Sequence, residues 1–336
     1  MATIYDIAKL CNLSASTVSY VLNGTGDKHR ISKATQENVR AAANRLNYHP
    51  NLSARSLSNS SNKLRIAFLW PEFYFEQTII SGMHAIRDIY RAVAENLEIH
   101  ILFFIPDHLM DKLDESVING NNGIVLLGAS LNDLKALSTQ SIQVPLVIAN
   151  RTYEGFPSVS IDNFEAGQLA CDLLCDRFPE QFISVWETQY HVASNLRRES
   201  FLARCAERGE NIEGRQFFCD GTSEDGHRLG LLLAQKKLLK KAIFCNNESV
   251  SAGIAGALQQ CGYQLGTDVF LLSTNNGPSS FCQYYYPPIS AIELKMEDVL
   301  VNAFRLCLGL VKRSAENNTA MMIRPEIAFR ETFPQT

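Results

Sequence analysis

The chain has 336 residues, of which 46% are hydrophobic and 20% are charged. This length exceeds what one compact core usually holds and predicts two or three domains. The ordinary content of Gly, Pro, Cys and aromatic residues excludes collagen-like, intrinsically disordered and disulfide-scaffold proteins.

Charge is distributed unevenly along the chain. Residues 1–65 hold nine Lys or Arg and three Asp or Glu, a net charge of +6. The whole chain has 31 basic and 35 acidic residues, which leaves 22 and 32 for the remaining 271 residues, a net charge of −10. A small basic segment on an acidic body is typical of a phosphate-binding module attached to a part that does not touch nucleic acid. A solvated basic tail is the alternative, but the segment also has apolar residues at helical spacing.

The cysteines and the N-terminus indicate the compartment. Nine scattered cysteines, with no C-x-x-C pair, suit a reducing environment. Cys171 and Cys175 are one helical turn apart and could orient two thiolates toward a metal. No second pair at ligand spacing completes a site, so we interpret both as small core residues and expect no metal and no cofactor. The start of the chain lacks a signal-peptide pattern, and no apolar run approaches the about 20 residues that span a bilayer. We therefore expect a cytoplasmic protein that makes no membrane contact.

Three short helices are predicted in the basic segment. Residues 4–11 place their apolar side chains on one helical face. The pattern then breaks, and Ser14 is a suitable N-cap for a second helix over about 15–23. Two glycines open a loop over 24–30, and Ser32 can cap a third helix. Two short helices joined by a three-residue turn and braced by a third form a helix-turn-helix.

The second helix has the surface expected of a helix that contacts DNA bases. Its outward positions are all small or polar: Ala15, Ser16, Thr17, Ser19, Tyr20 and Asn23. In a helix-turn-helix, residues near the start of this helix contact base edges in the major groove. An ordinary helical bundle without a DNA role is the alternative, but it would need neither this surface nor the surplus of positive charge. We therefore predict DNA binding for this segment.

The order of residues here resembles the lactose/galactose-repressor (LacI/GalR-type) family of transcription regulators. The matching stretches are IYDIA from Ile4, LSASTVSYVLN from Leu13, Ile31-Ser32, LNYHPN from Leu46 and ARSL from Ala54. The resemblance is specific over these 55 residues and extends less sharply over almost the whole chain. It implies an α/β fold class: a small all-α helix-turn-helix head plus a two-lobed periplasmic-binding-protein-like core with parallel sheets.

The resemblance also implies roles for individual head residues. Ala15, Ser16 and Tyr20 would face bases, with Ser19 beside them. The residues that would hold phosphates or the groove edge are Tyr5, Ser14, Thr17, Asn23 and His29. Family members often have Arg at the position of Tyr20, and Arg makes the commonest bidentate contact to guanine, so we expect Tyr20 to select a different base.

A hinge is expected after the head. Pro50 ends the third helix because a proline disfavours helix in the residue before it. By resemblance, residues 51–62 form a hinge helix that folds on DNA, with Asn51 and Ala54 at the minor groove and Leu57 wedged between base pairs. The alternative is a plain interdomain linker.

From residue 64 the pattern changes to short β-rich runs alternating with helical stretches. The expected strands are 64–70, 98–105, 123–127, 146–149, 158–161, 182–186, 216–219, 242–245, 269–273 and 289–292. Such alternation predicts parallel sheets, with ligands bound at the carboxyl ends of the strands. We expect a DNA-binding domain over 1–50, a hinge over 51–62 and an effector-binding and dimerisation core over 63–336. The core would divide into lobe 1 (about 63–160 plus 290–322) and lobe 2 (about 161–289 plus 323–332).

Candidate effector residues follow from the same resemblance. Asn150, Arg197, Asn247 and Asn275 should lie in the cleft between the lobes. Stacking surfaces could come from Phe73, Tyr74, Phe75, Trp186 and Tyr190. Asn150 and Asn275 stand where sugar-binding members frequently have Asp, which favours a neutral or anionic ligand such as a sugar acid, a phosphate ester or a nucleobase-like compound over a plain sugar.

The sequence argues against an enzyme. A nicotinamide enzyme needs G-x-G-x-x-G directly after a strand, but strand 64–70 is followed by Pro71-Glu72-Phe73. The predicted function is a homodimeric repressor of a near-palindromic operator, controlled by a small-molecule effector, a sugar or sugar derivative, in the cleft between the lobes. The alternative is a DNA-binding regulator whose core binds a partner protein or no ligand.

Overall fold

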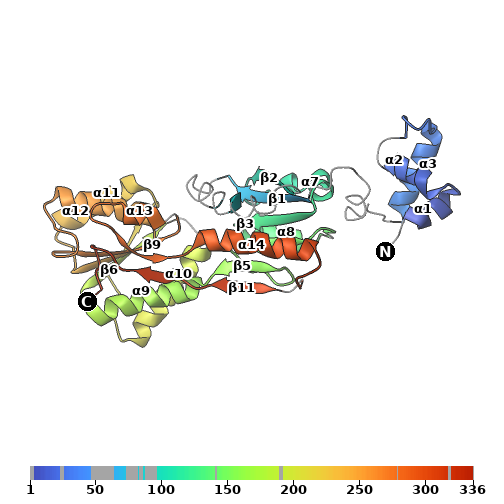
Figure 1. The fold of residues 1–336 in the computed structure, drawn as a ribbon. Coiled ribbons are helices and arrows are strands. Elements are labelled where there is room, and N and C mark those ends of the chain that lie inside the picture. The colour runs from blue at the N-terminus through green and yellow to red at the C-terminus, as the bar shows by residue number, and fades with distance from the viewer. Residues whose placement is uncertain are drawn as a thin grey trace.

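The computed structural model describes most of the chain in several segments. These are residues 4–22, 26–46, 64–72, 82, 86–87, 97–140, 142–188, 192–277, 279–316 and 319–335. In this part of the chain no helix is both long and apolar enough to cross a membrane. Figure 1 shows a small helical head and two α/β lobes, each built on its own sheet.

The head contains the three expected helices. They are α1 (Ile4–Cys11), α2 (Ala15–Leu22) and α3 (Lys33–Arg45). Their small common core consists of Ile7, Ala8, Val18, Val21, Val39, Ala42 and Ala43. These are the apolar positions that recur at helical spacing, so the periodicity alone selects the faces that pack together.

The first lobe is a six-stranded parallel sheet in the order β11-β5-β4-β3-β1-β2. The strands are β1 (Leu64–Pro71), β2 (Leu97–Phe104), β3 (Gly123–Leu127), β4 (Leu146–Ala149), β5 (Ser158–Ile161) and β11 (Ala320–Ile323). Alternate residues of the central strands pack into different hydrophobic clusters, because successive side chains of a strand point to opposite faces. One face packs on α14 (Met296–Val311), and the other packs on α6 (Leu109–Lys112), α7 (Glu115–Gly120) and α8 (Leu131–Ser138).

The second lobe has a six-stranded sheet in the order β12-β10-β9-β8-β6-β7. Its parallel strands are β6 (Phe182–Glu187), β7 (Gln216–Cys219), β8 (Ala242–Cys245), β9 (Phe270–Asn275) and β10 (Ser290–Glu293). The edge strand β12 (Glu326–Ala328) is antiparallel to β10. The helices are α9 (Asn163–Arg177), α10 (Val192–Glu207), α11 (Ser223–Gln235), α12 (Glu248–Gln260) and α13 (Ser279–Gln283).

The helices of the second lobe cover both faces of its sheet. Side chains of α9 and α10 join the cluster that includes Phe182 and Phe244, whereas α12 joins the cluster that includes Ile183 and Ile243. A Cβ on Gly167 would clash with the carbonyl oxygen of Arg197, so α9 and α10 cross in near backbone contact there. This close crossing fixes where α10 presents its side chains.

The fold class expected from the sequence is confirmed, with several differences in detail. Helix α14 and the strands β11 and β12 were not predicted. The expected return to the first lobe at residue 290 was wrong by one strand, because residues 290–293 form β10 and pair with β9 in the second sheet. The crossing therefore follows Glu293. Short strands such as β12 carry too few residues for a pattern of period two to show.

Candidate nucleic-acid interface and effector site

Helix α2 begins with a network of hydroxyl groups. The Ser14 Oγ accepts a hydrogen bond from the Thr17 backbone N–H at 3.1 Å, which makes Ser14 the N-cap that the sequence predicted. The same oxygen lies 2.9 Å from Ser16 Oγ and 2.8 Å from Thr17 Oγ1. Three hydroxyls therefore converge at the start of the helix, where backbone N–H groups favour an anion such as a phosphate.

The outward face of α2 combines short side chains with one aromatic ring. Ser16 and Tyr20 are exposed and lie one turn apart, while Ala15 and Ser19 are partly buried one turn apart beside them. The ring of Tyr20 is 39% exposed and stacks on His29, with 3.6 Å between ring centroids and 12° between ring planes. The loop residue His29 thus orients the largest side chain of the face.

The loop that carries His29 is fixed to α3. The buried amide of Gln36 donates to Asp27 Oδ1 at 2.8 Å and to the Ile31 carbonyl at 2.9 Å. Lys33 Nζ lies 2.9 Å from Asp27 Oδ2. Hydrogen bonds from Lys33 and Gln36 hold the pKa of Asp27 below its ordinary value. The negative charge of Asp27 is therefore partly compensated by Lys33 and Gln36. This compensation reduces the repulsion that a DNA phosphate would meet near the loop.

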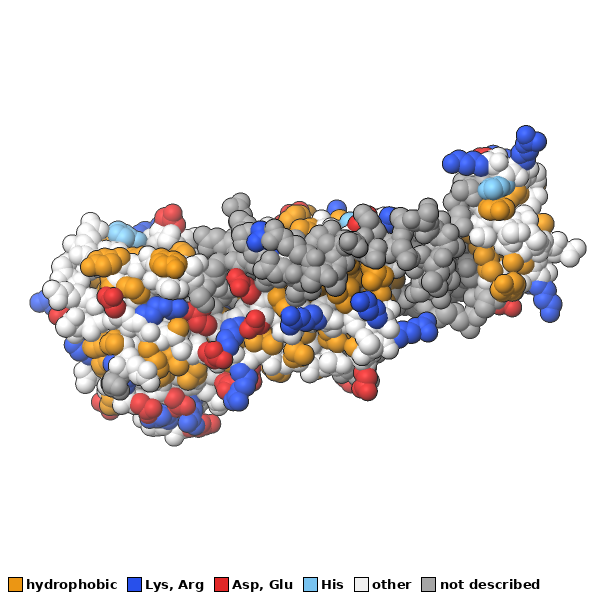
Figure 2. Space-filling model, in the orientation of Figure 1, with side chains coloured by type: hydrophobic (Ala, Val, Ile, Leu, Met, Phe, Trp, Pro, Cys, Tyr) orange, Lys and Arg blue, Asp and Glu red, His pale blue; other side chains and the backbone are white. Residues whose placement is uncertain are grey.

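The head also carries exposed positive charge and one further exposed aromatic group. The described Lys and Arg residues of the head are all exposed: Lys9, Lys28, Arg30, Lys33, Arg40 and Arg45. Figure 2 shows Lys and Arg side chains projecting from the head. Tyr5 on α1 is 73% exposed. The predicted contacts at Asn23, Asn51, Ala54 and Leu57 lie outside the described residues.

A second constellation lies at the carboxyl edge of the second sheet, around Arg197. The guanidinium of Arg197 is buried, with Nε donating to Asn246 Oδ1 at 2.7 Å and Nη1 donating to Asn163 Oδ1 at 2.5 Å. Asn246 directly follows β8, and Asn163 is the first residue of α9. Two amide oxygens therefore fix the orientation of the Arg197 guanidinium group.

Glu187, the last residue of β6, is held by neutral donors. Its Oε2 accepts from Ser194 Oγ at 2.7 Å and from Asn246 Nδ2 at 3.0 Å, and its Oε1 accepts from Asn247 Nδ2 at 3.3 Å. Asn247 also caps α12 through its side-chain oxygen, which accepts from the backbone of Ser249 and Val250. Glu187 is only partly buried, so it can present a carboxylate to a ligand.

Glu248 adds a second carboxylate next to Asn247. Its Oε2 accepts from the Asn276 backbone N–H at 3.3 Å. Burial raises the pKa of Glu248, nearby Glu187 adds to the rise, and Arg197 opposes it. The three charged groups are therefore close enough to influence one another.

Asn275 performs a different task from the one that the sequence suggested. It is completely buried, its Nδ2 donates to Glu293 Oε2 at 2.7 Å, and its Oδ1 accepts from the Gly277 backbone at 3.2 Å. Glu293 in turn lies 2.7 Å from Arg330 Nη2. This chain joins β9, β10 and the segment after β12, so Asn275 holds the sheet edge in place.

The predicted stacking role of Trp186 is wrong. Its ring is 1% exposed and packs edge-on against Phe201 and Phe244 at 5.4 and 5.5 Å between ring centroids. Its Nε1 donates to Ser184 Oγ at 2.9 Å. Trp186 follows the alternation of β6 into the core, so it offers no ring face to a ligand.

Asn150 lies immediately after β4 in the first lobe. It is buried and has φ at +61°, a left-handed conformation that Asn tolerates better than most residues. It thus has the strand-end position expected of a ligand-binding residue in a parallel sheet. The predicted surfaces at Phe73, Tyr74, Phe75 and Tyr190 lie outside the described residues.

Several site residues were missed in the sequence: Asn163, Glu187, Ser194, Asn246, Glu248 and Glu293. A usable signal existed for four of them, since Glu187, Asn246 and Glu293 end or follow predicted strands and Glu248 adjoins a residue that was selected. Strand ends of a parallel sheet converge at one edge. Ser194 and Asn163 lie on helices and gave no comparable signal.

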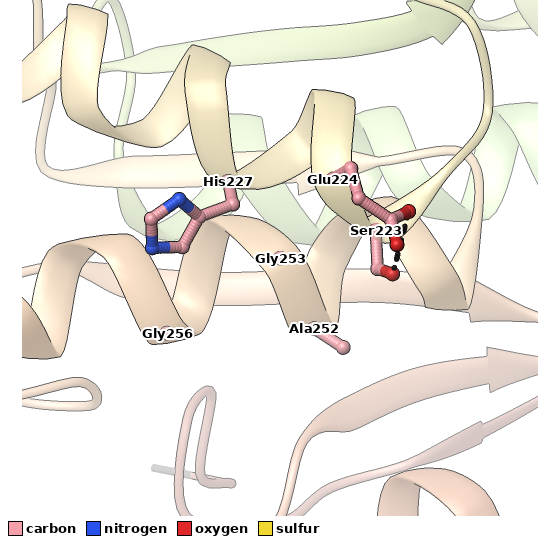
Figure 3. Close-up of a pocket in the computed structure, with 6 residues that line it drawn as sticks. All are labelled: Ser223, Glu224, His227, Ala252, Gly253 and Gly256. Carbon is pink, nitrogen blue, oxygen red and sulfur yellow. Dashed lines mark hydrogen bonds between the residues drawn. The ribbon is translucent and has the colours of Figure 1, made fainter.

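A separate hollow lies on the surface formed by α11 and α12. It measures about 430 Å³ and is lined by Ser223, Glu224, His227, Ala252, Gly253 and Gly256 (Figure 3). His227 Nε2 is 3.1 Å from Gln260 Oε1, and Ser223 Oγ donates to Glu224 at 3.3 Å. The predicted effector residues do not line this hollow.

Comparison with known proteins matches both parts of the chain. Residues 3–51 match the family "Bacterial regulatory proteins, lacI family", and residues 180–333 match "Periplasmic binding protein-like domain". The chain is 28% identical to the HTH-type transcriptional repressor PurR of Vibrio parahaemolyticus, over 99% of this chain and 98% of that protein. It is 25% identical to the NTD biosynthesis operon regulator NtdR of Bacillus subtilis, over 99% of this chain and 100% of that protein.

Solved structures show the same fold. The lac repressor dimer bound to operator and the anti-inducer ONPF has a TM-score of 0.70 at 17% identity, over 99% of each chain. A LacI family transcription regulator from Clostridium acetobutylicum has a TM-score of 0.75 at 20% identity, over 80% of this chain and 100% of that one. These relatives are transcription repressors or regulators, in agreement with the prediction that the chain is not an enzyme. The chain therefore combines a lacI-family helix-turn-helix domain with a periplasmic binding protein-like domain, and it is a DNA-binding transcription regulator.

Proposed function

We propose that the protein is a repressor that binds a near-palindromic operator as a homodimer. The observation that supports this most directly is the exposed face of α2, where Ser16 and Tyr20 project beside the hydroxyls at the start of the helix. One head offers few base contacts, and two heads related by a two-fold axis double them. Ala15, Ser16, Ser19 and Tyr20 face the bases, while Tyr5, Ser14, Thr17, Asn23 and His29 hold the backbone.

The hinge residues complete the DNA contact in this proposal. Asn51 and Ala54 lie at the minor groove, and Leu57 inserts between base pairs and kinks the duplex. The domain division predicted from the sequence, with a hinge over 51–62, is part of the proposal, as is an effector that alters the spacing of the two heads. Lac repressor was solved as a dimer on its operator, which favours the same assembly here.

Selection from a random duplex library tests the DNA half of the proposal. Full-length protein should enrich a two-fold symmetric sequence at moderate salt, and sedimentation should show a dimer on that sequence. Enrichment of no sequence over random competitor, with and without a panel of metabolites, would contradict sequence-specific binding. A monomer at saturating operator would contradict the dimer.

The effector in this proposal is a neutral polyhydroxy compound such as a sugar or sugar derivative. It lies between the lobes against Arg197, Glu187, Glu248, Asn247 and Asn150. Glu187 and Glu248 are bonded to neutral partners in the described structure, so a ligand that supplies hydroxyl donors satisfies them. A sugar acid or phosphate ester would bring a further negative charge to these carboxylates, so we now rank these anionic ligands below a neutral sugar, the reverse of the order expected from the sequence. The CelR structure, similar in fold, was solved in complex with cellobiose.

Thermal-shift titration of the full-length protein tests the effector class. Neutral mono- and disaccharides, including cellobiose, are compared with the matching sugar phosphates and sugar acids at equal concentration. We expect stabilisation by a neutral member, because a ligand that binds only the folded state raises the melting temperature. Stabilisation by anionic members alone would contradict the role given to Glu187 and Glu248.

A further inference from the structure

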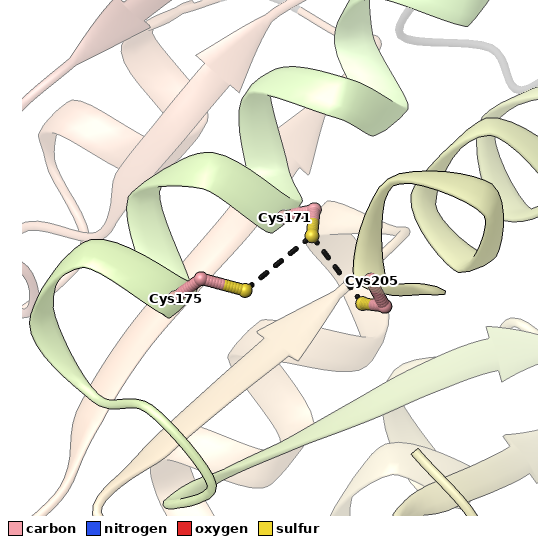
Figure 4. Close-up of side chains that lie close together, drawn as sticks. All are labelled: Cys171, Cys175 and Cys205. Carbon is pink, nitrogen blue, oxygen red and sulfur yellow. Dashed lines mark hydrogen bonds between the residues drawn. The ribbon is translucent and has the colours of Figure 1, made fainter. Parts of the chain in front are cut away.

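Three cysteines of the second lobe meet inside its hydrophobic core. Cys171 and Cys175 lie one turn apart on α9, and Cys205 approaches them from α10 (Figure 4). The Sγ of Cys171 is 3.5 Å from that of Cys175 and 3.3 Å from that of Cys205, and all three sulfurs lie within 4.8 Å of one another. The sequence suggested only the pair Cys171 and Cys175, because Cys205 is far from them in the chain and belongs to no ligand motif.

The three sulfurs are spaced to share one central atom. A triangle with sides of 3.3 and 3.5 Å and a third side of at most 4.8 Å has a centre no more than about 2.4 Å from each corner, and metal–thiolate bonds are about 2.3 Å long. An atom bonded to all three sulfurs therefore needs little movement of either helix. A disulfide between Cys171 and Cys205 would instead require the sulfurs to approach from 3.3 Å to about 2.0 Å.

The apolar surroundings of the three cysteines favour a complex with no net charge. Cys171 and Cys205 are completely buried and Cys175 nearly so, among apolar side chains of the core. A charged complex in such a place carries a large desolvation cost. The neighbouring cations Arg204 and Arg208 already contact Asp172, at 2.8 and 2.9 Å.

Two common thiolate-binding ions fit this environment poorly. Zinc prefers a fourth ligand, and among the described residues no other His, Cys, Asp or Glu joins the three cysteines. Copper(I) on three thiolates has a net charge of −2. Arsenic(III) forms three bonds to sulfur, and its complex with three thiolates is neutral.

The chemistry of trivalent arsenic also suits three neutral thiols buried among apolar side chains. Arsenous acid, As(OH)₃, does not depend on preformed thiolates. It condenses with three thiols to give As(SR)₃ and three water molecules. Each S–H proton leaves on a displaced hydroxide, and the arsenic stays at oxidation state +3, so no oxidant or reductant is needed.

We propose that Cys171, Cys175 and Cys205 form a binding site for trivalent arsenic. Cys175, the least buried of the three, is the point of entry. The three bonds cross-link α9 to α10, the helices that carry Asn163 and Arg197 at the effector site. Binding of arsenic to the folded chain raises its melting temperature.

Native mass spectrometry of full-length protein, reduced with a phosphine and titrated with sodium arsenite, tests the proposal. The expected product has one arsenic per chain with the loss of three hydrogens, and X-ray absorption shows three sulfur neighbours. The melting temperature rises and returns to its starting value when a competing dithiol is added. No such product at arsenite excess, or an arsenic atom with fewer than three sulfur neighbours, would overturn the proposal.

Single substitutions assign the site to these thiols. Cys205→Ala should abolish the product that lacks three hydrogens, whereas Cys282→Ala, which removes a buried thiol elsewhere in the core, should leave it intact. Cys175→Ala offers a second test at the least buried position, and it should retain at most a product with two sulfur bonds and one hydroxyl on arsenic. Circular dichroism and operator binding establish that each variant is folded. A full three-bond product in folded Cys205→Ala or Cys175→Ala would refute the assignment.

Discussion

The head and the second lobe build their functional surfaces in opposite ways. In the head, most of the described residues that we propose as DNA contacts come from one helix, α2, with Tyr5 from α1 and His29 from a loop, and they are exposed or partly buried; Tyr20 and His29 illustrate this arrangement. In the second lobe, the polar groups come from the ends of several strands and the starts of helices, and they are mostly buried and bonded to one another. A surface helix is therefore tolerant of substitution at its contacts, whereas a buried polar network couples ligand binding to stability.

The largest effect is expected from Arg197→Met. Loss of the guanidinium removes the effector contact that we propose for Arg197 and leaves Asn163 and Asn246 without their donor, so effector affinity should fall about 100-fold or more. The melting temperature should also fall, because unpaired buried polar groups cost about 1–3 kcal/mol each. Calorimetry with the effector and thermal unfolding measure the two effects.

Arg198→Met is the matched control on the same helix. Its guanidinium contacts Gln216 Oε1 and the ring of Phe218, away from the network around Arg197. Effector affinity should be unchanged in this variant. If Arg197→Met and Arg198→Met lost effector affinity equally, the loss would come from a less stable α10 and not from a contact between Arg197 and the effector.

Tyr20→Ala should weaken operator binding by about tenfold to 100-fold, because one base contact is worth about 1–3 kcal/mol. Stability and effector binding should hardly change, since the ring lies on the surface of the head. Fluorescence anisotropy with the selected operator measures the loss. Tyr284→Ala, which removes an exposed tyrosine of the core, is the control. Unchanged operator affinity in Tyr20→Ala would contradict the proposal that Tyr20 on α2 contacts a base.

His29→Ala should have a smaller effect on the same assay, about twofold to tenfold. The substitution removes the ring that orients Tyr20, and aromatic pairs contribute about 0.5–1.5 kcal/mol beyond burial. In the background of Tyr20→Ala the same change should cost less, because there is no ring left to orient. Full additivity of the two substitutions would contradict a positioning role for His29.

The smallest effect concerns the pH dependence of the core. The pKa of Glu248 is raised by folding, so its contribution favours the folded state at low pH and is lost as pH rises through the folded pKa. Glu248→Gln removes this dependence. The stability of the wild type relative to the variant should therefore decline as pH rises from about 4.5 upward. If chemical denaturation gave wild type and Glu248→Gln the same change in stability over this pH range, the raised pKa of Glu248 would be contradicted.

The sequence by itself determined the head and most of the sheets. Apolar residues at helical spacing, with Ser14 as the cap, define α1 and α2, and residues 123–127, 146–149, 158–161, 216–219 and 242–245 form the strands that were predicted. These features depend on neighbours within a few residues, so a local pattern suffices to specify them.

Only the tertiary structure decided which distant side chains meet. It placed Trp186 in the core instead of a ligand site, joined Glu187 to Ser194 and Asn246, and brought Cys205 to Cys171. Each of these contacts joins different strands or helices, so it depends on strand order and on the crossing of helices such as α9 and α10 at Gly167. A local pattern records which face a residue occupies, but the packing of elements far apart in the chain determines what lies opposite that face.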